Sequence, residues 1–312
     1  MTGAIAVVLA VSVLFAGAGP SLARTLAPAA AVRLLVPASV VVAGCGVYVL
    51  AVVTFTGAAQ LGEVAEVGRW SPGTLHALSP FSDTASLVAG AALLPAAGWV
   101  CVFVARTVRA LRETHRACHR LAGTGTLVIV DSDRVDAFTT PGLTGRIVVT
   151  TAMLSALEAD QRRALIAHER SHLTHRHPWW TITADLAGAV NPLLRPTARA
   201  IRQACERWAD EDAARATGRR LVAATIAQAA LLKSQRRGGL PVAAATGGEV
   251  AARVRALLRP PPRTRPAHAA AVIVMAAAII ASTVSVQLGT ETLFEQALQP
   301  GTAALVAGGR HG

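Results

Sequence analysis

Five consecutive residues, His168-Glu169-Arg170-Ser171-His172, form an H-E-x-x-H motif within a stretch of helical composition. On a helix, residues i and i+4 share a face, so the two imidazoles can bind one metal ion while the glutamate between them lies alongside. Two imidazoles and an adjacent carboxylate are the ligands and general base of a zinc hydrolase. The motif therefore predicts a Zn²⁺ site with Glu169 as the catalytic residue, rather than two surface histidines on a basic helix.

A catalytic zinc ion needs a third protein ligand and one open position for water. The candidates after the motif are His175, His177, Glu206 and Asp210. Three successive turns of a straight helix cannot converge on one ion, so His175 cannot join His172, and we expect His175 and His177 to contact solvent or lipid headgroups. Glu206 is far enough along the chain to lie on a second, antiparallel helix. We predict Glu206 as the third ligand, with Asp210 as its main rival.

Asp210 follows Glu206 by one helical turn and therefore lies on the same helix face. It can accept a hydrogen bond from a ligating imidazole, as outer carboxylates of zinc sites commonly do. Glu211 and Asp212 are expected to form an exposed acidic turn. Arg253 is a candidate for contacting the oxyanion or the substrate, and the alternative for it is a cation beside the membrane.

The elements that must position these residues include long apolar segments, since 53% of the 312 residues are hydrophobic and the mean hydropathy is +0.46. Charged residues avoid the windows 1–23, 34–57, 84–105 and 269–290. Each window exceeds the roughly 20 residues that a helix needs to cross a bilayer. The sequence predicts a membrane α-helical protein with four spans, three in 1–105 and one at 269–290, that enclose a domain at 106–268.

The net charge of +12 is concentrated between residues 106 and 268, which hold 26 Lys and Arg against 13 Asp and Glu. Basic residues near span ends stay on the cytoplasmic side. We therefore expect a multi-pass protein of the inner membrane with a cytoplasmic 106–268 domain, external termini and a short external tail at 291–312. The first window lacks the positive n-region of a signal peptide, so we expect it to remain as a span. The charge is explained by topology, and no direct nucleic-acid binding is expected.

Within the 106–268 domain, the pattern predicts both helices and short strands. A basic helix at 106–121 leaves the membrane, and β-branched runs at 127–131 and 146–151 belong to a small sheet with a substrate-accessible edge around Phe138 to Val149. The next helix runs from 158 to 177 and is ended by Pro178. Residues 179–194 form a helix at the membrane interface, anchored by Trp179 and Trp180, or one packed in the core. Further helices are predicted at 197–217, 219–235 and 249–258, with a loop at 236–248.

The stretch QRRALIAHERSHLTHRH, followed by Asn191-Pro192 and by CERWADEDA, resembles the BlaR/MecR-type integral-membrane zinc metallopeptidases, an antirepressor family related to HtpX-type proteases. The likeness covers about 130–260 by sequence and the whole chain by topology. It implies a cytoplasmic α+β domain of the gluzincin type and one Zn²⁺ per chain, bound by His168, His172 and Glu206. It also implies catalysis by Glu169 and an outer, supporting role for Asp210.

The resemblance has one departure, because the β-lactam sensors carry an extracellular penicillin-binding domain after the last span, and residues 291–312 contain no Ser-x-x-Lys. The sequence thus predicts an integral-membrane zinc endopeptidase without that sensor domain. By resemblance, its substrate is a cytoplasmic or membrane-associated protein such as a penicillinase-repressor-like regulator in a signalling pathway. A quality-control protease with broad substrates is the alternative. A non-catalytic, zinc-stabilised receptor or scaffold is the alternative from a different class.

Overall fold

Four long apolar helices dominate the computed structural model, which describes residues 1–120, 125–141, 145–235 and 247–298. They are α1 (Thr2–Thr25), α2 (Pro28–Ala58), α5 (Asp83–Arg120) and α12 (Pro266–Ala297), and each contains a segment long and apolar enough to cross a membrane. The helices α2, α5 and α12 each contain one uncharged window of the sequence entirely, and α1 contains its window except for Met1. The predicted loop at 236–248 and the predicted tail lie largely outside the described residues.

The helix α5 runs through one predicted domain boundary. The chain was expected to pass from a span to a separate domain at residues 105 and 106, but α5 continues without a break through this point. The reason is that the first arginines mark where the helix surface becomes polar, which does not interrupt backbone hydrogen bonding. The basic 106–121 segment is therefore the continuation of the third apolar helix.

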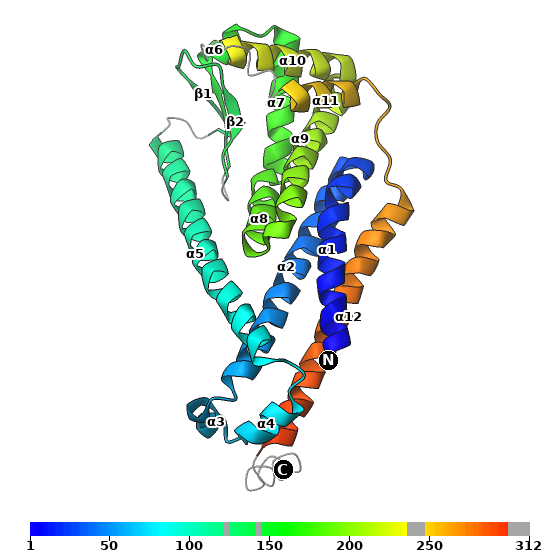
Figure 1. Ribbon diagram of the computed structural model, residues 1–312. Coiled ribbons are helices and arrows are strands. Elements are labelled where there is room, and N and C mark those ends of the chain that lie inside the picture. The colour runs from blue at the N-terminus through cyan, green and yellow to red at the C-terminus, as the bar shows by residue number, and fades with distance from the viewer. Residues whose placement is uncertain (121–124, 142–144, 236–246, 299–312) are drawn as a thin grey trace, which may run out of the picture.

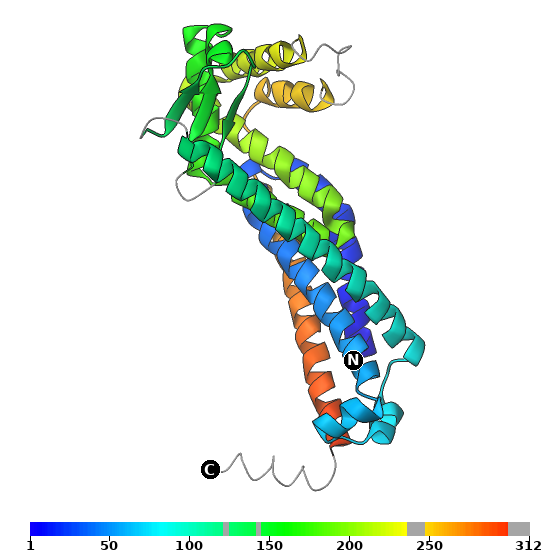
Figure 2. The same ribbon diagram turned by 90° about the vertical axis from the view of Figure 1, so that its left-hand side faces the viewer.

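The molecule is elongated, with α1, α2 and α12 bundled at one end and the sheet and motif helices at the other (Figures 1 and 2). Two short helices, α3 (Gly62–Gly68) and α4 (Pro72–Leu78), connect α2 to α5. Trp70 forms an isolated bridge with Leu298, and the Thr290 hydroxyl lies 3.6 Å from the Met1 sulfur. The N-terminus, the α2–α5 connection and the end of α12 thus lie at the end of the bundle opposite the sheet (Figure 1).

The sheet contains three strands, β1 (Leu127–Val130), β2 (Ala137–Thr139) and β3 (Ile147–Thr150), in the order β1-β3-β2. β3 pairs in parallel with β1 and antiparallel with β2, and all four of its residues are buried. The predicted substrate edge from Phe138 to Val149 is therefore wrong at Val149, because β3 is the central strand and both its sides are already paired. Phe138 belongs to β2, which does lie at an edge of the sheet. A short helix, α6 (Thr151–Ser155), follows β3.

The helix that carries the motif is shorter than predicted. α7 (Ala159–Thr174) begins with a capping box between Glu158 and Gln161 and ends three residues before His177. Arg176 has a left-handed backbone (φ 52°, ψ 41°), and α8 (His177–Val190) starts immediately after it. Pro178 lies in the first turn of α8, where its missing N–H costs nothing. Pro178 thus begins a helix instead of ending one.

The helix α8 packs in the core, which was one of its two predicted locations. Ala184 and Ala187 are buried in a hydrophobic cluster, which they share with α1, with α2 and with residues 198–208 further along the chain. Trp180 packs against this cluster and donates its Nε1–H to the His175 carbonyl oxygen, while Trp179 is 40% exposed. A 3₁₀ turn (Pro192–Leu194) then leads into α9 (Arg195–Thr217).

The helix α9 links the apolar bundle to the motif helix. Its buried face is rich in small residues, including Ala198, Ala204 and Ala209, so neighbouring helices can approach it closely. At its first turns Thr197 contacts α1 at Gly19, where a Cβ would collide with the threonine side chain. Two more helices, α10 (Arg219–Gln235) and α11 (Gly247–Leu257), pack beside its other end.

Candidate metal centre and catalytic site

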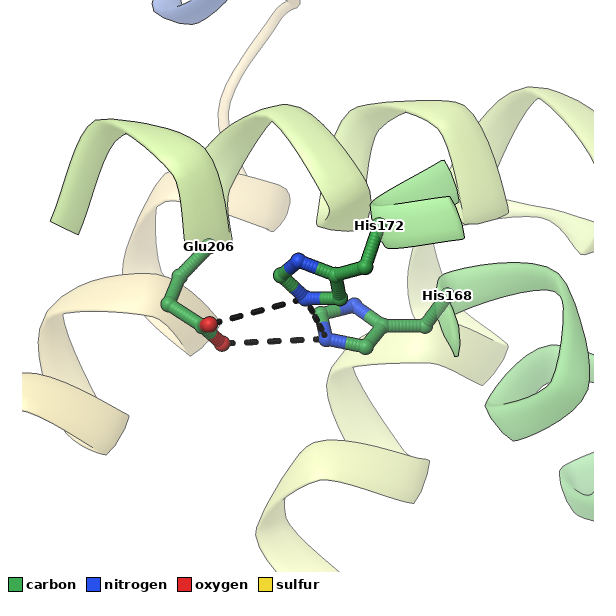
Figure 3. Close-up of side chains that lie close together, drawn as sticks. All are labelled: His168, His172 and Glu206. Carbon is green, nitrogen blue, oxygen red and sulfur yellow. Dashed lines mark hydrogen bonds and ion pairs between the residues drawn. The ribbon is translucent and has the colours of Figure 1, made fainter. Parts of the chain in front are cut away.

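Three potential metal ligands meet where α7 packs against α9. His168 and His172 lie one turn apart on α7 and direct their Nε2 atoms at the Glu206 carboxylate of α9 (Figure 3). The two Nε2 atoms are 3.1 Å apart, and they lie 3.7 and 3.5 Å from the Glu206 oxygens. One ligand atom from each residue lies within 4.8 Å of the others. The sequence-predicted residues are thus brought together from segments 34 positions apart.

The other nitrogen of each imidazole faces a buried partner. His168 Nδ1 lies 3.0 Å from Asp210 Oδ1, and Asp210 is 2% exposed. His172 Nδ1 lies 2.9 Å from His177 Nδ1. Asp210 therefore occupies the place expected of a carboxylate that orients a ligating imidazole.

The expected surface positions of His175 and His177 are wrong. His177 is 1% exposed, and His175 Nε2 lies 2.9 Å from Asp212 Oδ2. The left-handed backbone of Arg176 separates α7 from α8, and the side chains of His175 and His177 after this break contact Asp212 and His172. The sequence interpretation assumed a helix that continued to residue 177.

The expected acidic turn after Asp210 is wrong too, because Glu211 and Asp212 lie inside α9 and pair with other residues. Asp212 accepts a hydrogen bond from the Ser171 hydroxyl at 2.6 Å and also pairs with Arg215. Glu211 pairs with Arg219 at 2.5 Å. Asp212 therefore links α9 to the motif helix.

Arg253 reaches the same cluster from α11. Its Nε and Nη2 atoms donate to the two Asp210 oxygens at 2.8 and 2.6 Å, and its Nη1 lies 2.9 Å from Glu206 Oε2. Its side chain is only 17% exposed. Arg253 therefore faces the residues of the predicted site.

Glu169 lies in the same cleft but is not part of the ligand cluster. It is 7% exposed, and its Oε2 accepts a hydrogen bond from the Thr139 hydroxyl at 2.9 Å. Burial raises the pKa of Glu169 above its ordinary value, although the nearby His168 and the Thr139 hydroxyl oppose this shift. Sequence reasoning missed Thr139, since only the packing of β2 against α7 brings it to the glutamate.

Burial and neighbouring charges shift the pKa values of all three residues of the cluster. Burial lowers the pKa of His168, but the neighbouring Asp210 and Glu206 carboxylates outweigh it and raise that pKa to about 9. Burial and the neighbouring His168 lower the pKa of His172 to about 4. Burial raises the pKa of Glu206, but its bond to His168 and the charge of Arg253 hold that pKa well below its ordinary range. Two imidazoles and one ionised carboxylate are a donor set that fits Zn²⁺ and leaves a fourth position open.

The cluster borders a cleft of about 520 Å³ between β2 and the helices α7, α9, α10 and α11. The cleft is mainly apolar beside Leu165 and Ile226, while Lys233 lies at its edge and pairs with Asp136 at 2.7 Å. Phe138 and Thr139 of the edge strand line its opposite wall. A peptide segment entering the cleft would therefore meet a strand edge, apolar side chains and the Glu169 carboxylate.

Apolar helices, an H-E-x-x-H pair and a glutamate from a following helix define the class of membrane metalloproteases. Comparison with known proteins agrees with this class: residues 105–237 match the model of Peptidase family M48. Over 69 residues the chain is 42% identical to the Protease HtpX homolog of Acidiphilium cryptum (strain JF-5), an alignment that spans 20% of this chain and 23% of that relative. No solved structure matches the chain significantly.

Both matches support a membrane metalloprotease of the HtpX type, in agreement with the predicted relationship to those enzymes. Peptidases of family M48 are zinc metalloproteases, and the His168, His172 and Glu206 cluster is consistent with such a centre. Neither match bears on the narrower resemblance to the BlaR/MecR type.

Proposed function

We propose that this chain is an integral-membrane zinc-dependent endopeptidase. The observation that carries the proposal is the convergence of the His168 and His172 Nε2 atoms and the Glu206 carboxylate within 4.8 Å, beside a cleft that also holds Glu169. These three residues would hold one Zn²⁺ per chain, with Asp210 orienting His168. When bound, Zn²⁺ supplies Lewis acidity that polarises a carbonyl group and acidifies water.

Glu169 moves the proton in the proposed reaction. Its carboxylate accepts a proton from the attacking water, whose oxygen adds to the scissile carbonyl carbon. The protonated Glu169 then gives this proton to the leaving amine nitrogen as the C–N bond breaks. The raised pKa of Glu169 suits a group that must both accept and release a proton near neutral pH. The Thr139 hydroxyl holds one oxygen of this carboxylate, and Glu169 lines the cleft.

An extended substrate would bind along β2. This strand pairs with β3 on one side, and its residues Ala137, Phe138 and Thr139 line the cleft. Main-chain hydrogen bonds to such an edge bind a peptide with little sequence preference, and neighbouring pockets select side chains. We propose that Arg253 orients the Asp210 and Glu206 carboxylates, and that guanidinium N–H groups not used for these contacts reach the substrate carbonyl oxygen.

The proposed orientation places the cleft in the cytoplasm and both termini outside the inner membrane. It is supported by the basic 106–268 segment and by the position of Met1, Trp70 and Leu298 at the bundle end opposite the sheet. Reporter domains fused after residue 259 should behave as cytoplasmic, and those fused after residue 61 should behave as external. An external signal at 259 would contradict the orientation.

The identity of the substrate is a more specific proposal than the type of reaction. A penicillinase-repressor-like regulator, and with it a role in signalling, is supported by sequence resemblance, while the mainly apolar cleft beside a strand edge favours a broad-substrate membrane protease. A buried Glu169 beside the ligands favours an enzyme over a receptor or scaffold, because a structural zinc site has no use for it. Comparing the cytoplasmic protein N-termini of cells that carry wild type or Glu169→Gln would identify the substrates.

The central test separates metal binding from turnover. Glu169→Gln should retain one Zn²⁺ and lose peptidase activity, because it removes the base and leaves the ligands. Glu206→Gln should lose the metal at ordinary zinc concentrations, because a neutral amide replaces a charged ligand. The measurements are zinc content by elemental analysis and cleavage of an unfolded protein substrate. Full activity of Glu169→Gln would refute the proposed mechanism.

A further inference from the structure

His177 is a buried histidine that the proposed reaction does not use. It lies in the first turn of α8 and is 1% exposed. Its Nδ1 lies 2.9 Å from His172 Nδ1, whereas its Nε2 is buried and has no hydrogen-bond partner in the described part of the chain. The contact with His172 is therefore the hydrogen bond that this ring makes in the structure.

The geometry of this contact requires one arrangement of protons. A metal ligand must offer a lone pair, so His172 must be unprotonated at Nε2, the nitrogen that faces Glu206. The His172 proton then lies on Nδ1 and needs an acceptor. His177 Nδ1 can accept it only if the His177 ring carries its own proton on Nε2, which is the atom left without a partner.

The position of His177 is fixed from two sides. The left-handed backbone of Arg176 separates α7 from α8, and the first residue of α8 contacts α7 at His172. The Trp208 ring, 5% exposed, lies 4.9 Å from the His177 ring between centroids, and the Arg33 guanidinium lies 4.7 Å over the same indole. An aromatic wall thus holds the imidazole against His172 without competing for its nitrogen atoms.

We propose that His177 is a positioning residue that accepts the Nδ1 proton of His172, and so keeps the His172 Nε2 lone pair directed at the metal position. This inference rests on the proposed metal site. His177 serves His172 as Asp210 serves His168, but with a neutral acceptor in place of a carboxylate. Loss of such an outer partner typically weakens metal binding by about 10- to 100-fold.

The test compares side chains of similar shape at residue 177. In His177→Asn an amide oxygen replaces the ring Nδ1 at nearly the same distance from the backbone, whereas His177→Leu has the same branching and no acceptor. We expect zinc affinity close to wild type in His177→Asn and a loss of about 10- to 100-fold in His177→Leu. His177→Ala also removes the acceptor, and it does so without placing a branched apolar side chain at this position. Zinc dissociation constants are measured by competition with a chelator on the full-length protein in detergent.

Each outcome is decisive for the inference. If His177→Leu binds zinc as wild type does, or if His177→Asn is weakened as much as His177→Leu, the hydrogen bond is not what matters and the inference is overturned. The thermal midpoints of the zinc-free variants serve as the folding control. If wild type itself binds no zinc, the proposed function fails. A wild type that binds zinc and a His177→Leu of equal affinity would refute only the role of His177.

Discussion

The Asp210 carboxylate interacts with two neighbouring side chains, His168 and Arg253. Its Oδ1 lies 3.0 Å from His168 Nδ1, and both of its oxygens accept from Arg253. A buried carboxylate requires such partners, because an unpaired charge in the interior is costly. The burial of Asp210 thus depends on both the histidine and the arginine.

We expect Asp210→Asn to bind zinc about 10- to 100-fold more weakly than wild type, because the amide orients His168 but no longer raises its basicity. The control is Asp160→Asn, the same chemical change in an exposed pair with Arg163 on α7. Zinc titration of the two variants in parallel is the measurement. Complete loss of zinc in Asp210→Asn with retention in Glu206→Gln would exchange the roles of the two carboxylates.

At the scale of elements, the junction of α7 and α8 determines where the histidines after the motif lie. Arg176 is exposed, and its left-handed backbone is uncommon for a residue with a side chain. The junction makes its own hydrogen bonds, from the Arg176 N–H to the Leu173 carbonyl and from the Trp179 N–H to the Arg176 carbonyl. The backbone shape of this turn, and not the arginine side chain, is therefore what the site needs.

Substitutions at this turn should follow backbone preference. Arg176→Gly should leave the thermal midpoint unchanged or raise it, because glycine adopts left-handed angles without the steric cost of about 1–2 kcal/mol that other residues incur. Arg176→Val should lower the midpoint and weaken zinc binding, since a β-branched residue is strained in this conformation. Thermal unfolding in detergent and zinc titration measure both effects. A valine variant that matches wild type in both would contradict this reading.

At the scale of the whole molecule, α9 joins the apolar bundle to the metal centre. Its early residues pack against α1 and α2, and its later residues carry Glu206 and Asp210. One close approach is at Gly19 of α1, where the Thr197 side chain leaves no space for a Cβ. The apolar helices and the helices that carry the candidate site are thus parts of one packed structure.

Two glycines of α1 provide a matched test of this contact. Gly19→Ala should lower the thermal midpoint, because overpacking costs about 1–3 kcal/mol. Gly17→Ala should leave the midpoint unchanged or raise it, because a Cβ at Gly17 meets nothing within 4 Å and alanine favours a helix by about 1 kcal/mol. Thermal unfolding of the full chain in detergent compares them. Equal stability of the two variants would show that α1 and α9 are not tightly packed.

The apolar helices and the motif could be predicted from the sequence, because both depend on local properties. Uncharged windows of 22 to 24 residues predicted where α1, α2, α5 and α12 lie, and helical spacing placed His168 and His172 on one face. The spacing of Glu206 and Asp210 on a second helix likewise anticipated which side chains the structure brings together. The ends of the elements were less predictable, since polar residues continue a helix beyond its apolar stretch.

The tertiary structure alone decided the roles of residues whose neighbours are distant or lie beyond a turn. Thr139 reaches Glu169 because β2 is the strand that packs beside α7, and Asp212 reaches Ser171 because α9 packs along that helix. His177 faces His172 because Arg176 adopts a left-handed conformation, and an arginine in the sequence does not predict that conformation. Such contacts depend on packing free energy summed over many residues, whereas sequence periodicity reports only which residues share a face of one element.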